Sequence, residues 1–153
     1  MDKKKYKVAI VGCGGIGHAH MEGYNKVEEV EVIACCDPVP SAVEYYKKEF
    51  NIPHGFKDID EMLRVAKPEI ISICVWHLLH DEITIKVANY ESVKGIICEK
   101  PMAIGVEKAR SMVNACEEND VKLAISHQRR FTPGWIKAKE LVENGEIGIP
   151  NRA

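Results

Sequence analysis

With 153 residues, the chain is long enough to bury one substantial core and too short for two ordinary domains. A formal net charge of −2, with charges of both signs interspersed, gives no electrostatic reason to expect nucleic acid or an anionic membrane as a partner. The apolar runs at residues 8–11 and 70–79 are too short or too interrupted for a signal peptide or a membrane span, so we expect a cytoplasmic protein.

Short apolar runs alternate with amphipathic segments along most of the chain, as is typical of βαβ units. The apolar runs predict strands at residues 7–11, 30–36, near Gly55, 70–75, 95–98 and 122–126. Helices are predicted at about 16–26, 41–50, 58–65, 79–90, 106–119 and 134–144, with Asp58 and Glu61 as a capping pair and Gly145 ending the last one. The expected fold is α/β: a doubly wound, mostly parallel six-stranded Rossmann sheet with helices on both faces.

The cysteines and histidines offer no convincing metal site. Six cysteines lack a C-x-x-C pair, and four of them fall in predicted strands, which indicates reduced, small apolar side chains. Cys13 is an exception that either is reactive or fills space. His18-x-His20 and His77-x-x-His80 each lack a third ligand in a convincing pattern, so no metal is expected.

A glycine motif follows the first predicted strand and opens the first predicted helix: Gly12, Cys13, Gly14, Gly15, Ile16 and Gly17. Gly12 permits the tight turn, Gly14 lets the backbone approach a pyrophosphate, and Gly17 lets the helix pack close to the sheet. The phosphates are expected on free N–H groups at the helix N-terminus. The alternative is a glycine-rich turn in an α/β protein that binds no nucleotide.

Asp37 ends the second predicted strand, 20 residues after Gly17. An acid at this place accepts hydrogen bonds from the adenosine ribose hydroxyls and repels a 2′-phosphate. Because no cation follows until Lys47, the sequence favours NAD as the cofactor over NADP. The alternative role of Asp37 is that of a turn or cap residue before the next helix.

Ligands of open parallel sheets bind beyond the carboxyl ends of the strands, so the residues that follow each strand are functional candidates. After the last three predicted strands these are Trp76, His77 and His80; Glu99, Lys100 and Pro101; and His127, Gln128, Arg129 and Arg130.

Several of these motifs occur together in one known family. They are the glycine motif, Asp37-Pro38, Glu99-Lys100-Pro101, Arg130-Phe131-Thr132-Pro133 and Gly145-Glu146-Ile147-Gly148. Through them the chain resembles, over nearly its whole length, the N-terminal domain of the glucose-fructose oxidoreductase, inositol dehydrogenase and rhizopine-catabolism oxidoreductases. The resemblance implies NAD(P)-dependent oxidation or reduction of a hydroxyl or carbonyl carbon, usually on a sugar or cyclic polyol.

The resemblance also assigns roles. Lys100 is implied as the catalytic lysine, which contacts the substrate oxygen and moves its proton, and Glu99 as the residue that places the nicotinamide ribose and Lys100. The Lys100–Pro101 peptide bond is expected to be cis. The fork of donors on a guanidinium group suits Arg129 and Arg130 to the nicotinamide side of the pocket, to an anionic substrate or to ion pairs with nearby acids. A site role is favoured for Arg130 and a surface ion pair for Arg129, and Gln128 is expected at the substrate.

The segment after the fourth predicted strand departs from the family pattern. Family members commonly have Thr-Pro-Asn where this chain has Val75-Trp76-His77, although His80 is retained. Trp76 lies either against the cofactor or over the following helix. His80 either points to the cofactor or holds the start of the helix, the second role being favoured.

Family members continue into a second, α+β domain that supplies most substrate contacts. We therefore expect residues 1–126 to be the NAD-binding Rossmann domain and residues 127–153 to be a loop and connecting helix toward a domain absent here. The expected partners are a sugar-like or polyol-like substrate and a second copy or partner chain that supplies the missing domain. The alternative is a non-catalytic NAD-binding module with a regulatory or scaffold role.

Overall fold

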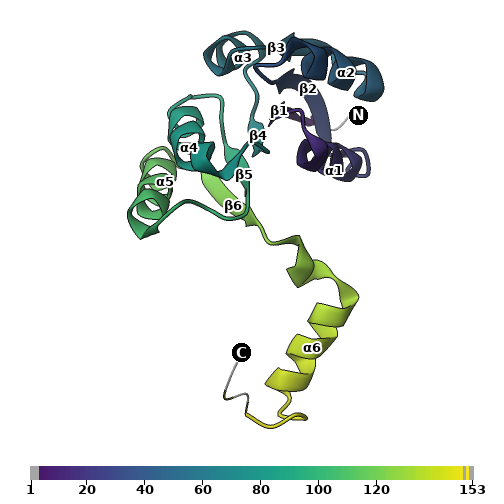
Figure 1. Cartoon of the computed structure of the whole chain (residues 1–153), viewed down its shortest axis with the longest axis vertical. Helices are drawn as coiled ribbons and strands as arrows, with labels where there is room; N and C mark the ends of the chain where they lie inside the picture. The colour runs from purple at the N-terminus through teal and green to yellow at the C-terminus, as the bar shows by residue number, and fades with distance from the viewer. Residues whose placement is uncertain (1–3, 150, 152–153) are drawn as a thin grey trace.

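The computed structural model describes residues 4–149 and 151, and these residues form one parallel sheet with helices between its strands (Figure 1). The strands are β1 (Tyr6–Val11), β2 (Val30–Cys36), β3 (His54–Phe56), β4 (Ile70–Ile73), β5 (Gly95–Glu99) and β6 (Lys122–Ser126). The α-helices are α1 (Gly15–Tyr24), α2 (Pro40–Phe50), α3 (Ile59–Ala66), α4 (His80–Ala88), α5 (Val106–Glu118) and α6 (Pro133–Glu143). Two short 3₁₀ helices, η1 (His77–Leu79) and η2 (Gln128–Phe131), precede α4 and α6.

The strand order is β3-β2-β1-β4-β5-β6, and every neighbouring pair is parallel. The chain moves outward from β1 to one edge of the sheet and then returns to build the other half, which is the doubly wound arrangement. This order confirms the predicted fold and places the switch point between β1 and β4. The loops that follow these two strands therefore border the crevice in which such sheets bind ligands.

Side-chain alternation along the strands creates two cores. On one face, β-strand side chains such as Val11 and Ile73 pack with Leu63 of α3, Val87 of α4 and Met112 of α5. On the other face the strands meet α1 and α2, where a smaller cluster is formed by residues that include Ile10, Met21, Val43 and Tyr46. Both faces are therefore covered by helices, as predicted.

Most predicted elements are confirmed, and the ends that differ have local causes. The strand predicted to reach Val75 ends at Ile73, because its partner β1 ends at Val11 and turns into the glycine motif. The helix predicted from Leu79 begins as η1 and continues as α4. Asp58 caps α3 by accepting a hydrogen bond from the Glu61 N–H at 2.8 Å, and Gly145 has the expected positive φ of 72°.

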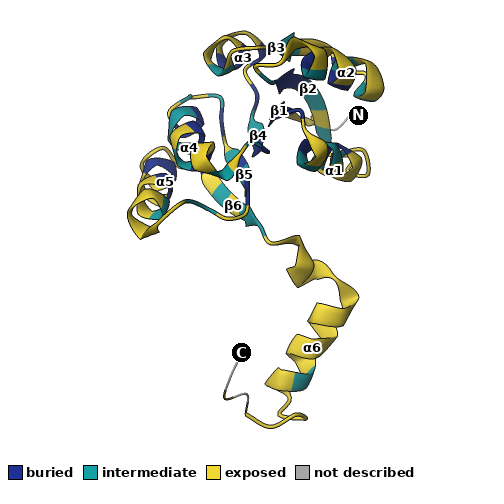
Figure 2. Cartoon of the chain, viewed as in Figure 1, coloured by how far each residue is buried: buried dark blue, intermediate teal, exposed yellow. Residues whose placement is uncertain are grey.

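Helix α6 extends away from the sheet (Figure 1), and in Figure 2 it is almost entirely exposed. Only Leu141 of this helix is partly buried. The segment carries large apolar side chains in solvent, including Phe131 (79% exposed), Trp135 (59%) and Ile149 (94%). Within residues 4–149 and 151, no helix is both long and apolar enough to cross a membrane.

Candidate functional site

Strand β1 runs directly into the glycine loop (residues 12–17), and its glycines differ in whether the fold itself requires them. Gly12 has φ +100°, and a Cβ there would lie 2.5 Å from the Cys74 carbonyl oxygen, so only glycine fits. Gly14 has an ordinary φ of −102°, and a Cβ at Gly14 or Gly15 would meet nothing within 4 Å. The fold itself therefore does not require glycine at position 14, whereas a ligand that touches the backbone there would.

The glycine loop leads into the N-terminus of α1, which is built to receive an anion. The N–H groups of a first helical turn have no intrahelical acceptor, and the helix dipole places partial positive charge at this end. The first turn of α1, all of it within the described residues, contains no acidic side chain, and Gly14 provides no side-chain cap. The backbone here is therefore available to phosphate oxygens.

Gly17 and Tyr46 hold the glycine loop against the sheet. A Cβ at Gly17 would lie 2.4 Å from the Gly12 carbonyl oxygen and 2.8 Å from Tyr46 Oη. Tyr46, on α2, is buried and donates its hydroxyl hydrogen to the Gly14 carbonyl oxygen. Burial raises the pKa of Tyr46, so the hydroxyl remains a donor at neutral pH.

Asp37 lies at the end of β2, beside the glycine loop. Its Oδ2 accepts a hydrogen bond from the Cys13 N–H at 2.9 Å, and its Oδ1 accepts one from the Val39 N–H, also at 2.9 Å. Asp37 thus acts as a turn residue before α2 and at the same time fixes the glycine loop. A carboxylate oxygen accepts more than one hydrogen bond, so these contacts leave capacity for ribose hydroxyls.

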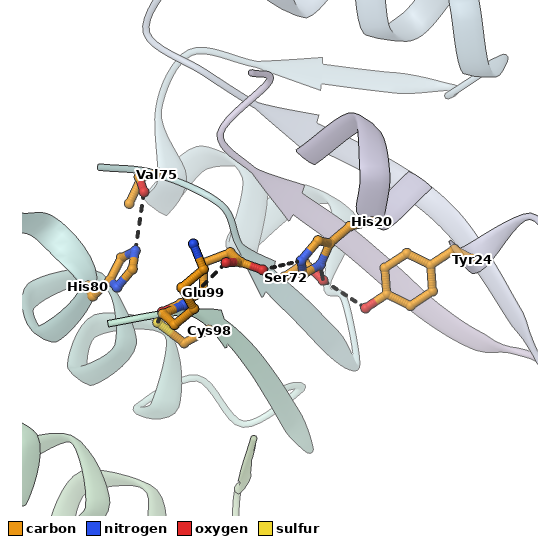
Figure 3. Close-up of polar contacts among 8 residues, drawn as sticks. His20, Tyr24, Ser72, Val75, His80, Cys98 and Glu99 are labelled. Carbon is orange, nitrogen blue, oxygen red and sulfur yellow. Dashed lines mark hydrogen bonds and ion pairs between the residues drawn. The ribbon is translucent and has the colours of Figure 1, made fainter. Parts of the chain in front are cut away.

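Glu99 ends β5 and is only 4% exposed (Figure 3). Its Oε1 lies 3.0 Å from Nε2 of His20, and its Oε2 accepts a hydrogen bond from the Lys100 N–H at 3.3 Å. Burial acts to raise the pKa of Glu99, but hydrogen bonds from His20 and Ser126 outweigh it and hold the pKa below its usual range. Glu99 is therefore a carboxylate at neutral pH.

His80 begins α4 and is 1% exposed. Its Nδ1 lies 2.8 Å from the Pro101 carbonyl oxygen and its Nε2 lies 3.2 Å from the Val75 carbonyl oxygen. The imidazole thus joins the loop after β4 to the loop after β5. These two backbone contacts favour the loop-holding role, and a cofactor contact of His80 stays a prediction.

Lys100 follows Glu99 and is exposed, and the Lys100–Pro101 peptide bond is cis, as expected. A pocket of about 330 Å³ is lined by Lys100 together with His127, Gln128, Arg129 and Arg130, so η2 brings the candidates of two strand ends together. Within the described part of the chain, Arg129 forms no ion pair, contrary to its predicted surface pairing. No acidic residue lines this pocket, and its other charged lining residues, Lys100 and Arg130, are also cationic.

Trp76 precedes η1 and is 67% exposed. Its ring meets the His77 ring edge-on, with 5.7 Å between the ring centroids. The indole is therefore mostly exposed to solvent, and it follows β4 at the end of the sheet where ligands bind.

The six cysteines are free and buried. Burial raises the pKa of Cys36, of Cys74 and of Cys98 to about 12, so these thiols are inert, as the sequence predicts. A hydrogen bond with Cys35, together with burial, also raises the pKa of Cys13, which makes the space-filling interpretation the better one. Among the described residues, no group of three His, Cys, Asp or Glu side chains could hold a metal ion.

Four residues near the site are not predicted from the sequence as site residues: His20, Tyr24, Tyr46 and Ser72. His20 was considered only as a metal ligand. The available signals were a serine within the apolar strand β4 and the four-residue spacing of His20 and Tyr24, which puts both on one helix face.

Comparisons with known proteins agree on one family. Residues 6–127 match the family model described as the oxidoreductase family with an NAD-binding Rossmann fold. Myo-inositol 2-dehydrogenase of Thermotoga maritima is 27% identical over 145 residues, which cover 95% of this chain and 43% of that protein. D-apiose dehydrogenase of Paraburkholderia graminis is 27% identical over 147 residues, covering 96% and 39%.

Solved structures give the same picture. Scyllo-inositol dehydrogenase from Lactobacillus casei, with bound NAD(H) and scyllo-inositol, superposes with a TM-score of 0.86 at 26% identity, covering 95% of this chain and 43% of that one. The WlbA dehydrogenase from Bordetella pertussis, in complex with NADH and UDP-GlcNAcA, gives a TM-score of 0.88 at 27% identity, covering 95% and 44%. The chain therefore spans less than half the length of these relatives.

Proposed function

Because the chain belongs to the oxidoreductase family with an NAD-binding Rossmann fold, we propose that it is the cofactor-binding domain of an NAD-dependent dehydrogenase acting on a sugar, a cyclic polyol or a related hydroxyl or carbonyl compound. The observation that carries the proposal is the exposed Lys100, which lies beside the buried carboxylate Glu99 at the sheet edge that also presents the glycine loop. Inositol and apiose dehydrogenases among the relatives support this substrate class.

The residues present fit NAD. The open backbone at Gly14 and the free N–H groups at the start of α1, which begins at Gly15, suit the pyrophosphate, and Asp37 suits the adenosine ribose hydroxyls. We assign the flat face of Trp76 to the cofactor rings and Arg130 to the nicotinamide side of the pocket. We assign Cys13 and Ile16 to the cofactor site through their backbone atoms. His80 and Glu99 hold the loops that border this site.

Lys100 is the proposed catalytic residue. When bound, NAD supplies the carbon that accepts or returns the hydride. Lys100 holds the substrate oxygen and stabilises the negative charge that develops there. In the reduction direction the Lys100 ammonium group gives a proton to the carbonyl oxygen, and oxidation runs the same transfer in reverse. Gln128, on the pocket wall, is proposed as a substrate contact.

We propose that polypeptide other than residues 1–153, a further domain or a partner chain, supplies the rest of the substrate pocket; we call it the covering part. In this proposal residues 1–126 form the cofactor domain, and residues 127–153 connect it to the covering part. The connecting segment leaves a hollow of about 820 Å³, lined by apolar residues that include Ile125, Phe131 and Trp135 and also by Arg129, Arg130 and Lys139. It shares Arg129 and Arg130 with the pocket of Lys100, so covering both would exclude water from the reacting atoms and orient the substrate.

The exposed apolar side chains also favour a second candidate, a non-catalytic NAD-binding module that acts with a partner chain. Both candidates bind NAD, and they differ in chemistry. The dehydrogenase, completed by its covering part, reduces NAD in the presence of a polyol and loses this activity in the Lys100→Ala variant. The module shows no polyol-dependent reduction of NAD in any assembly.

Calorimetric titration of the purified chain with NAD and with NADP tests cofactor binding. We expect NAD to bind at least about tenfold more tightly than NADP, a difference of about 1.4 kcal/mol, because Asp37 repels the 2′-phosphate. The Asp37→Asn variant should narrow this preference, whereas Glu44→Gln, which removes an exposed charge on α2, should leave it unchanged. Absence of binding with either nucleotide would contradict the proposed function.

A further inference from the structure

A buried polar chain crosses from α1 to the candidate catalytic loop (Figure 3). His20 and Tyr24 lie on the same face of α1, four residues apart. Tyr24 Oη lies 2.8 Å from Ser72 Oγ, which in turn lies 3.1 Å from His20 Nδ1. His20 Nε2 lies 3.0 Å from Glu99 Oε1, and the other Glu99 oxygen accepts from the Lys100 N–H at 3.3 Å.

The hydrogen bonds of this polar chain can all run in one direction, from the Tyr24 hydroxyl to the Glu99 carboxylate. Glu99 is a carboxylate and can only accept, so the imidazole hydrogen lies on Nε2 of His20. In that tautomer Nδ1 accepts from the Ser72 hydroxyl, whose oxygen accepts from the Tyr24 hydroxyl. Each hydroxyl then donates once, and Glu99 receives hydrogens from both His20 and Lys100.

Its burial distinguishes this polar chain from an ordinary ion pair on the surface. Ser72 is fully buried, and the His20 and Glu99 side chains are only 12% and 5% exposed. Burial of polar and charged groups costs free energy unless every partner is in place, so packing alone would favour apolar residues here. The same helix also carries a surface pair, His18 with Glu22, at 3.6 Å and with side chains 35% and 63% exposed.

We propose that His20 is a positioning residue, which fixes the Glu99 carboxylate and thereby couples the phosphate-binding end of α1 to the backbone of Lys100. The proposal rests on the proposed function, because it assumes that a nucleotide binds at the glycine loop. A ligand that settles on the N-terminus of α1 moves His20 with the helix. Glu99 moves with His20 through their hydrogen bond. The position of Lys100 relative to the substrate is thereby adjusted when the cofactor binds.

The amide resonance of Lys100 reports this coupling, because that N–H donates to Glu99. ADP is the probe, since it carries the phosphates and adenosine ribose expected at the glycine loop and at Asp37 but has no nicotinamide to reach Lys100. In the ¹⁵N-labelled chain, ADP should displace the amide resonances of residues 12–17 and also that of Lys100. In His20→Leu the loop resonances should still move, and the displacement of Lys100 should be lost.

Two variants distinguish a positioning role of His20 from a role in folding alone. His20→Gln keeps a donor for Glu99 and should restore the Lys100 response. His18→Leu removes the surface pair of the same helix and should leave the response unchanged. If His20→Leu does not fold, the wild-type chain still decides the question together with Tyr24→Phe, which shortens the polar chain but leaves the His20–Glu99 contact in place and should retain the response.

The outcomes distinguish this inference from the proposed function beneath it. If ADP moves no resonance of the glycine loop, the proposed nucleotide site is wrong, and the coupling is wrong with it. If ADP moves the loop but not Lys100 in the wild-type chain, or if the full Lys100 response persists in folded His20→Leu, the coupling alone is overturned. Nitrogen shifts of the His20 ring that place its hydrogen on Nδ1 would also contradict the proposed direction of the polar chain.

Discussion

At the scale of single residues, Gly14 and Gly15 of the glycine loop form a matched pair, whose variants distinguish an effect on folding from an effect on binding. A Cβ at Gly14 or at Gly15 would meet nothing within 4 Å, so alanine at either position should leave the fold intact. We expect Gly14→Ala to weaken NAD binding at least about tenfold, about 1.4 kcal/mol, because its methyl group occupies the approach of the pyrophosphate. Gly15→Ala should bind NAD nearly as the wild type does. Calorimetry with thermal melting tests both, and equal affinities would refute a phosphate contact at Gly14.

Trp76 allows a second test at this scale, because the chain has only two tryptophans. In Trp135→Phe, Trp76 becomes the single indole, and stacking on the cofactor should quench its fluorescence as NAD is added. The reverse variant, Trp76→Phe, leaves Trp135 on α6, and its emission should not respond. Unchanged Trp76 emission at saturating NAD, as judged by calorimetry, would place the indole away from the cofactor.

At the scale of elements, the strands, helices and sheet order could be predicted from alternating apolar runs, capping pairs and glycines. Hydrophobic periodicity does not reveal contacts between side chains distant in the sequence. The contact of His20 with Glu99 joins residues 79 positions apart, and that of His80 with Pro101 joins two loops. The candidate residues at strand ends were therefore found from the sequence, whereas the residues that hold them, Tyr46 and Ser72 among them, required the packing of α1 and α2.

The link between α1 and β5 predicts a pH dependence of stability. Glu99 has a lowered pKa in the folded chain, so its contribution is complete above the unfolded value, near 4.5, and is lost as the pH falls through the folded value. We expect Glu99→Gln to be less stable than the wild type at pH 7 by about 1 to 3 kcal/mol, since a charged acceptor is lost from a buried contact.

Denaturant titrations of both proteins across acidic pH measure this prediction. The difference between their free energies of unfolding should be constant above about pH 5.5 and should shrink below about pH 4, as protonation removes the charge from wild-type Glu99. Other carboxyls with lowered pKa, such as Glu69 and Asp81, titrate in both proteins and cancel in the difference. A difference independent of pH would show that the Glu99 charge contributes nothing to stability.

At the scale of the whole molecule, the sheet and its five flanking helices share two packed cores, whereas α6 buries almost nothing against them. Stability follows the apolar area that is removed from water, and the side chains of α6 remain in solvent. Deletion of residues 133–153 should therefore change the melting temperature by less than about 2 °C, which corresponds to a loss of less than about 1 kcal/mol in a domain of this size. NAD affinity should also be unchanged. A fall of many degrees would mean that α6 covers an apolar surface in solution, either on its own sheet or on a second copy, and would move the domain boundary beyond residue 126.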